Sequence, residues 1–205
     1  MTTGVVDYGS GNFASVWNAV AAVSGDVKRV ARPEDLGGCS HVVLPGVGAF
    51  AAAMRKLEKT GILEALSAEA AAGRIQLLGI CVGMQVLASR GLEFEECRGM
   101  GLVKGTVEAI SVDRSRFALP HMGWNSLSDL GAAPLFRHME GEPSFYFVHS
   151  FHLKCEDPDA RSVFCEYGGV RVTAAVSKGN VHGVQFHPEK SQDNGLQLLR
   201  NFIAL

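Results

Sequence analysis

Long apolar runs are missing from this 205-residue chain, and so is any strong charge imbalance. No stretch approaches the roughly 20 apolar residues that a membrane-spanning helix needs, and the first residues lack the basic region and apolar core of a signal peptide. The net charge of −2 comes without a cluster of basic residues. Neither nucleic acid nor a membrane is therefore an expected partner.

Cysteine is scarce, and its spacing argues against two common uses. The five cysteines are odd in number, and no two of them form a Cys-x-x-Cys pair. A disulfide framework favours an even number, and a structural zinc site needs closely spaced pairs. We therefore expect free thiols in a reducing cytoplasm and no metal site.

Linkers, repeats and low-complexity tracts are also missing. Apolar residues make up 47% of the chain and charged residues 20%, which is ordinary for a globular protein. The length suits one α/β domain with a sizeable core and is rather short for two. We expect residues 1–205 to form a single domain.

The first half alternates short β-branched runs with helical patterns. Strands are expected at residues 4–7, 27–30, 41–44 and 77–80. Helices are expected at residues 13–20, 50–57 and 62–72, and from 82 to 87. This alternation predicts a parallel sheet covered by helices.

The second half is richer in strand-like runs separated by glycine and proline. They lie at residues 105–112, 145–149, 163–167, 170–176 and 181–184. A closing helix carries Leu196, Leu199 and Ile203 on one face. We expect an α/β three-layer sandwich with a mostly parallel central sheet, to which antiparallel strands are added in the second half.

Residues 79–83 read GICVG, the G-x-nucleophile-x-G form of a sharp strand-to-helix elbow. Cys81 would sit in a strained conformation, and glycines on both sides would relieve crowding. A helix N-terminus favours a thiolate, and the N–H of Val82 is placed to donate to an oxyanion. A buried, inert cysteine fits this pentapeptide about equally well.

A second pattern lies near the C-terminus, where His187 and Glu189 are two residues apart. In an extended segment, this spacing points both side chains to one face. A carboxylate beside an imidazole holds its tautomer, which leaves the other ring nitrogen free to take a thiol proton. By itself, however, this pattern is more often a surface turn.

The two patterns together resemble the class I glutamine amidotransferases. Further stretches carry the resemblance, in order: VDYGSGN at 6–12, LPGVGAF at 44–50, GICVGMQ at 79–85, PHMGWN at 120–125, FYFVHSF at 145–151 and QFHPEKS at 185–191. Within that family, these motifs are most similar to those of the glutaminase subunits of imidazole glycerol phosphate synthase, from histidine biosynthesis. Residues 120–125 are the most specific of them. The resemblance runs from residue 5 to the final helix.

The resemblance implies a role for each matching residue. Cys81 would attack the side-chain amide of glutamine, His187 would move the proton, and Glu189 would orient His187. The oxyanion donors would be the N–H of Val82 and the Gly46–Val47 peptide, after that peptide reorients, so the isolated chain is expected to have low activity. Residues implied in glutamine binding are Gly48, Gln85, Glu93, Ser150 and Phe151, the last of which stands where tyrosine is frequent in relatives.

The resemblance also implies a partner and no cofactor. Ammonia would pass to a separate (β/α)₈-barrel synthase chain in a heterodimer, and the residues implied at that interface are Asn12, Trp124 and Lys190. Two alternatives remain open: a related glutaminase that feeds surface-sugar amidation, and a catalytically silent regulatory subunit.

Overall fold

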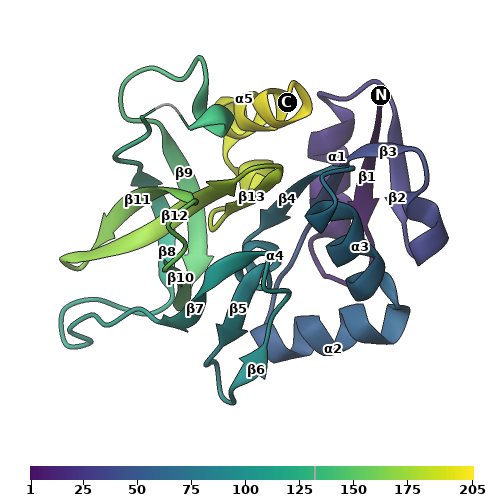
Figure 1. Ribbon diagram of the computed structural model, residues 1–205. Helices are drawn as coiled ribbons and strands as arrows, with labels where there is room; N and C mark the ends of the chain where they lie inside the picture. Colours follow the sequence, from purple (N-terminus) through teal and green to yellow (C-terminus); the bar gives the residue numbers. More distant parts are fainter. Residues whose placement is uncertain (132) are drawn as a thin grey trace.

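The central element of this computed structural model, which describes residues 1–131 and 133–205, is a seven-stranded sheet (Figure 1). Its strand order is β11-β12-β13-β4-β3-β1-β2. The parallel strands are β1 (Thr2–Val6), β2 (Val27–Val30), β3 (Cys39–Leu44), β4 (Gln76–Ile80) and β13 (Val181–Val184). Two antiparallel strands, β12 (Val170–Lys178) and β11 (Arg161–Tyr167), extend one edge.

Helices cover both faces of this sheet. They are α1 (Phe13–Ala21), α2 (Phe50–Thr60), α3 (Ile62–Ala71) and α5 (Gln192–Ile203). The chain moves from β1 to β2 in one direction and from β3 to β4 in the other, so right-handed crossovers place α1 opposite α2 and α3. Helix α5 contacts α1, and its Phe202 packs on the rings of His41 and His182 in the sheet. The predicted three-layer α/β sandwich is confirmed.

The second half differs from the prediction in one respect, because several of its strands form separate small sheets. A four-stranded sheet has the order β10 (Phe151–Cys155), β7 (Val103–Ala109), β5 (Ala88–Gly91) and β6 (Cys97–Arg98). A hairpin joins β8 (His121–Ser126) to β9 (Ser144–His149). The expected strands at 105–112 and 145–149 therefore lie outside the central sheet. Strands β5, β6, β8 and β10 were not anticipated.

The helix expected at residues 82–87 is only one turn long, as α4 (Val82–Gln85). The carbonyls of Val86 and Leu87 accept hydrogen bonds from the N–H groups of Met100 and Val103, respectively. Those bonds divert the chain from the helix into strand β5. Three short 3₁₀ helices complete the described secondary structure, namely η1 (Pro33–Leu36), η2 (Pro134–Phe136) and η3 (Pro188–Lys190).

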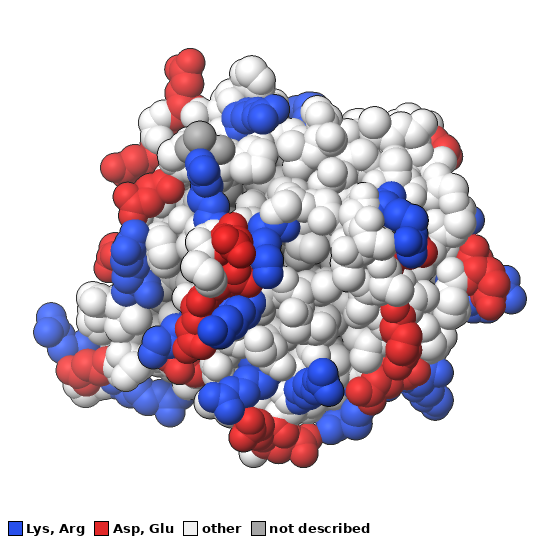
Figure 2. All heavy atoms as spheres, in the orientation of Figure 1, with Lys and Arg blue, Asp and Glu red and all other residues white. Residues whose placement is uncertain are grey.

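The surface is of mixed charge. Basic and acidic side chains are interspersed along the rim of the face in Figure 2. Within the described residues, no helix is both long and apolar enough to cross a membrane.

Candidate active site

Cys81 stands at the sharp turn between β4 and α4, with φ 54° and ψ −111°. A Cβ on Gly79 would lie 2.4 Å from the carbonyl oxygen of Gly83, and a Cβ on Gly83 would lie 1.9 Å from the carbonyl oxygen of Leu44. Real side chains cannot approach a backbone so closely. The predicted steric reason for both glycines is therefore confirmed.

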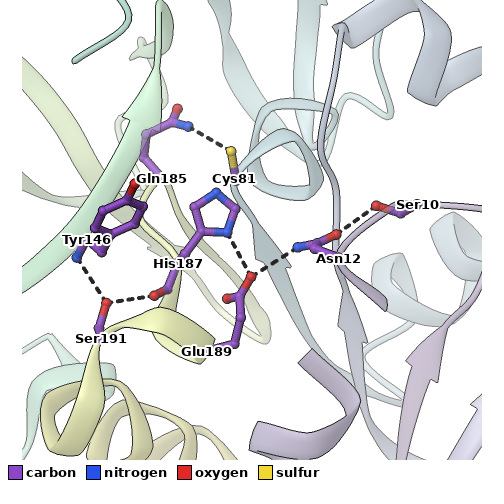
Figure 3. A network of polar contacts seen from close by, with 8 residues as sticks. All are labelled: Ser10, Asn12, Cys81, Tyr146, Gln185, His187, Glu189 and Ser191. Carbon is purple, nitrogen blue, oxygen red and sulfur yellow. Dashed lines mark hydrogen bonds and ion pairs between the residues drawn. The ribbon is translucent and has the colours of Figure 1, made fainter. Parts of the chain in front are cut away.

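The sulfur of Cys81 lies at the start of a very short helix and among polar side chains. Helix α4 has only four residues, so its dipole contributes less than the sequence argument assumed. One hydrogen-bond donor is the side-chain amide of Gln185, whose Nε2 lies 3.7 Å from Sγ. The imidazole of His187 also faces the sulfur (Figure 3).

The ring of His187 lies between Cys81 and Glu189 (Figure 3). Its Nδ1 is 2.8 Å from Oε1 of Glu189, and both side chains are almost completely buried. Because a carboxylate only accepts, Nδ1 carries a proton, and Nε2 is the nitrogen that can exchange a proton with the thiol. Nε2 has no hydrogen-bond partner within the described residues and points toward the thiol. The structure thus brings sulfur, imidazole and carboxylate together.

The carboxylate of Glu189 is itself held by a second row of polar groups. The amide of Asn12 donates to Oε1 of Glu189 at 3.2 Å, and the hydroxyl of Ser10 donates to Oδ1 of Asn12 at 2.7 Å. Asn12 was expected at a partner interface, but it is only 7% exposed. In this structure, Asn12 supports Glu189 from the loop after β1.

The backbone of His187 is anchored to strand β9. Its N–H donates to the carbonyl of Tyr146 at 2.9 Å, and its carbonyl accepts from the hydroxyl of Ser191 at 2.6 Å. The same hydroxyl accepts from the N–H of Tyr146 at 3.0 Å. These bonds fix the position from which the imidazole reaches the sulfur (Figure 3).

The charge state of His187 is set by opposing effects. Burial lowers the pKa of His187, but hydrogen bonding and charge at Cys81 and Glu189 raise it to about 9. The imidazolium form is therefore favoured at neutral pH, as expected for a ring that can take and keep a thiol proton.

A pH dependence of stability follows from this raised pKa. A histidine with a folded-state pKa above its ordinary 6.5 stabilises the fold below pH 6.5 and loses that contribution as the pH rises through 9. We expect the free energy of unfolding to fall by up to about 3 kcal/mol over this interval, since one pKa unit is worth about 1.4 kcal/mol. Denaturant titrations at several pH values measure this fall in the free energy of unfolding. His187→Asn should remove the slope, and an unchanged slope in that variant would contradict the assignment.

A cavity of about 420 Å³ opens beside Cys81. It is lined by Val47, Gly48, Cys81, Val82, Gln85, Glu93, Phe94, Pro120, Val148, His149, Ser150, Phe151 and His187. All five residues predicted to bind substrate are in this lining. Gly46 is not part of the lining, because its Cα packs directly against the backbone of Gly83 and Val82.

Two of the lining side chains have well-defined partners. Gln85 Nε2 donates to the carbonyl of Phe151 and to Oε1 of Gln185, each at 3.0 Å. The carboxylate of Glu93 accepts from the N–H of Phe50 at 2.8 Å, at the start of α2. Glu93 is thus tied to Phe50, the last residue of the 44–50 motif.

The N–H of Val82, one of the two predicted oxyanion donors, is already engaged. It donates to the carbonyl oxygen of Gly46 at 3.4 Å. The Gly46–Val47 peptide therefore directs its C=O, and not its N–H, toward Val82. A Cβ on Gly46 would lie 2.4 Å from the nitrogen of Gly83, so only glycine allows this approach.

His149 and Gln185 were not among the predicted site residues, although His149 falls within the motif at 145–151 and Gln185 within the motif at 185–191. His149 donates through Nδ1 to the carbonyl of Phe151 at 2.8 Å, and its Nε2 lies 3.1 Å from Nδ1 of His121. Burial lowers the pKa of His149 to about 3 and that of His121 to about 4. Two neutral rings therefore support the wall of the cavity.

The remaining predicted residues lie toward the surface. Trp124 is 48% exposed on strand β8 and packs edge-on against Tyr146. The ammonium of Lys190 lies 5.7 Å from the centre of the Tyr146 ring. This ring therefore connects two of the predicted interface residues with the strand that anchors His187.

Comparisons with known proteins agree with this geometry. The family model described as glutamine amidotransferase class-I matches residues 5–205. The imidazole glycerol phosphate synthase subunit HisH of Leptospira borgpetersenii is 40% identical, covering 98% of this chain and 99% of that relative. The protein of the same name from Rhodospirillum rubrum is 43% identical, with coverages of 99% and 98%. A solved structure described as a glutamine amidotransferase, at 20% identity, superposes with a TM-score of 0.77 and coverages of 98% and 97%, which supports the fold.

Proposed function

We propose a function for this chain from one premise: it belongs to the class I glutamine amidotransferase family. It is the glutaminase subunit of imidazole glycerol phosphate synthase and serves histidine biosynthesis. Residues 1–205 are proposed to act as one glutamine amidotransferase domain. The cytoplasm is the proposed compartment, since all five cysteines are free thiols.

The proposed reaction is hydrolysis of the glutamine side-chain amide through a thioester. The sulfur of Cys81 attacks the amide carbon, and Nε2 of His187 takes the thiol proton and returns it to the departing ammonia. Water then hydrolyses the thioester to glutamate. Glu189 keeps the ring in the required tautomer and stabilises the imidazolium. The position of the His187 ring between the other two groups carries this proposal (Figure 3).

Glutamine is proposed to occupy the cavity beside Cys81. Glu93 would pair with its ammonium group, while backbone groups at Gly48 and at Ser150–Phe151 would meet its carboxylate. Gln85 uses its amide N–H groups on protein partners, so its oxygen is the atom left to accept from substrate. A buried site needs such matched partners because unpaired charges are costly to desolvate.

The oxyanion hole is proposed to be closed in the isolated chain. The Val82 N–H is occupied by the carbonyl of Gly46, and the Gly46–Val47 peptide presents no N–H to the site. Rotation of that peptide would supply both donors. Since losing one donor typically costs about a hundredfold or more in rate, the chain alone should be a poor glutaminase.

A partner subunit follows from the family assignment, and we propose that it is a (β/α)₈-barrel synthase in a separate chain. Ammonia would pass directly between the subunits, because bulk water would protonate it. The proposed contact surface includes Trp124 and Lys190. Asn12 is buried and would respond to the partner through its hydrogen bond to Glu189.

Trp124→Ala tests this surface. Exposed aromatic side chains often dominate an interface, so we expect the dissociation constant of the complex to rise at least about 30-fold. Isothermal titration with the synthase measures it, and thermal unfolding of the free chain should change little. Unchanged affinity together with unchanged activation of the glutaminase would exclude Trp124 as an anchor.

The function as a whole is tested by measuring glutamate release with and without the synthase subunit and its nucleotide ligand. We expect a large increase when both are present. A glutaminase that feeds surface-sugar amidation would respond to a different partner. A silent regulatory subunit would release no glutamate with either partner.

A further inference from the structure

Gln185 is a hydrogen-bond donor in contact with the nucleophile, yet it is not among the residues that line the cavity. Its side chain is fully buried at the end of β13, and its backbone N–H is fixed by the carbonyl of Ala174 at 2.8 Å. Its Nε2 lies 3.7 Å from Sγ of Cys81 (Figure 3). Gln185 therefore contacts the sulfur from within the core, outside the lining of the proposed substrate cavity.

The orientation of this amide is determined by a backbone carbonyl. The carbonyl of Phe151 can only accept, so the atom of Gln85 that faces it at 3.0 Å must be the amide nitrogen. The same nitrogen lies 3.0 Å from Gln185, which must then present its oxygen there. The –NH₂ group of Gln185 is consequently the end that faces the sulfur.

We propose that Gln185 is a positioning residue for the nucleophile, whose amide N–H stabilises the thiolate form of Cys81 and holds the sulfur beside His187. This inference rests on the proposed role of Cys81. A thiol is a weak acceptor and a thiolate a strong one, so the donor favours the ionised form.

Four other titratable groups face the sulfur or the cavity beside it. They are His187 from the segment after β13, Tyr8 from the loop after β1, His149 at the end of β9 and Glu93 from the loop after β5. His187 supplies the positive charge. Burial raises the pKa of Tyr8 to about 12, so its hydroxyl stays neutral during turnover. Gln185 therefore adds a donor whose own charge does not change with pH.

The test is the pH profile of alkylation of Cys81 by iodoacetamide in the free chain, followed by the mass of the peptide that contains Cys81. Gln185→Met keeps the length of the side chain and removes the N–H. We expect its profile to shift to higher pH by about one unit or more. Gln185→Glu places a carboxylate against the sulfur and should shift the profile further. Gln76→Leu, on strand β4, is the matched control and should leave the profile unchanged.

Thermal unfolding separates this role from a purely structural one, which would lower stability without moving the alkylation profile. Unchanged profiles in both Gln185 variants would overturn the proposal. Because iodoacetamide needs no glutamine, a shifted profile in a chain that never releases glutamate would support the role of Gln185 and refute the proposed function.

Discussion

Cys81→Ala is expected to abolish glutamine-dependent synthesis by the assembled enzyme while leaving synthesis from added ammonium salts intact. The variant lacks the atom that forms the thioester, and loss of a covalent nucleophile typically costs about 10⁴-fold or more. The synthase subunit performs the second reaction and does not need the sulfur. Product formation with each nitrogen source, measured in parallel, gives both results.

The same pair of assays has two other possible outcomes. Glutamine-dependent turnover that persists in Cys81→Ala would mean that another group is the nucleophile. Loss of both activities would indicate a damaged complex, so complex formation must be checked by titration. Cys165→Ala is a suitable control, because Cys165 is a buried cysteine in strand β11, far along the sheet from the elbow.

Gly83→Ala is expected to destroy the elbow. A Cβ at this position would lie 1.9 Å from the carbonyl oxygen of Leu44 and 3.0 Å from its carbonyl carbon. Backbone atoms cannot move aside as a flexible side chain can, so β3 and α4 must separate. We expect the free energy of unfolding to fall by about 3 kcal/mol or more and glutaminase activity to drop to background. Denaturant titration and glutamate release measure the two effects.

Gly25→Ala is the matched control for this substitution. Gly25 precedes β2, its backbone φ is outside the left-handed range, and a Cβ there would meet nothing within 4 Å. It should be neutral or slightly stabilising. Wild-type stability and activity in Gly83→Ala would show that the elbow is not packed as described.

The first half of the fold could be predicted because its signals are local. The run at 27–30 is strand β2 with the same bounds, and the helices beginning at Phe50 and Ile62 start where expected. The second half depends on pairing between distant segments. Strand β8 at His121–Ser126 was seen only as a motif, because only His121 in it is buried and Gly123 interrupts it, which gives a weak strand pattern.

The triad pattern could be proposed from sequence because its residue types are rare in that order. The side chains that hold the triad in place could not be predicted from sequence. Asn12 reaches Glu189 across 177 positions of the chain, and Gln185 reaches Cys81 across 104. Such contacts depend on the strand order β13-β4-β3-β1, which no periodicity specifies. The orientation of the Gly46–Val47 peptide likewise depends on packing against Gly83.

Labelling of the assembled enzyme by a diazo-ketone analogue of glutamine tests the central claim. That claim is that His187 and Glu189 prepare Cys81 to attack the substrate. The account predicts one covalent adduct, on the peptide that contains Cys81, which glutamine suppresses and His187→Asn slows strongly. An adduct on a different cysteine such as Cys97, or none at all while glutamate is still released, would contradict it.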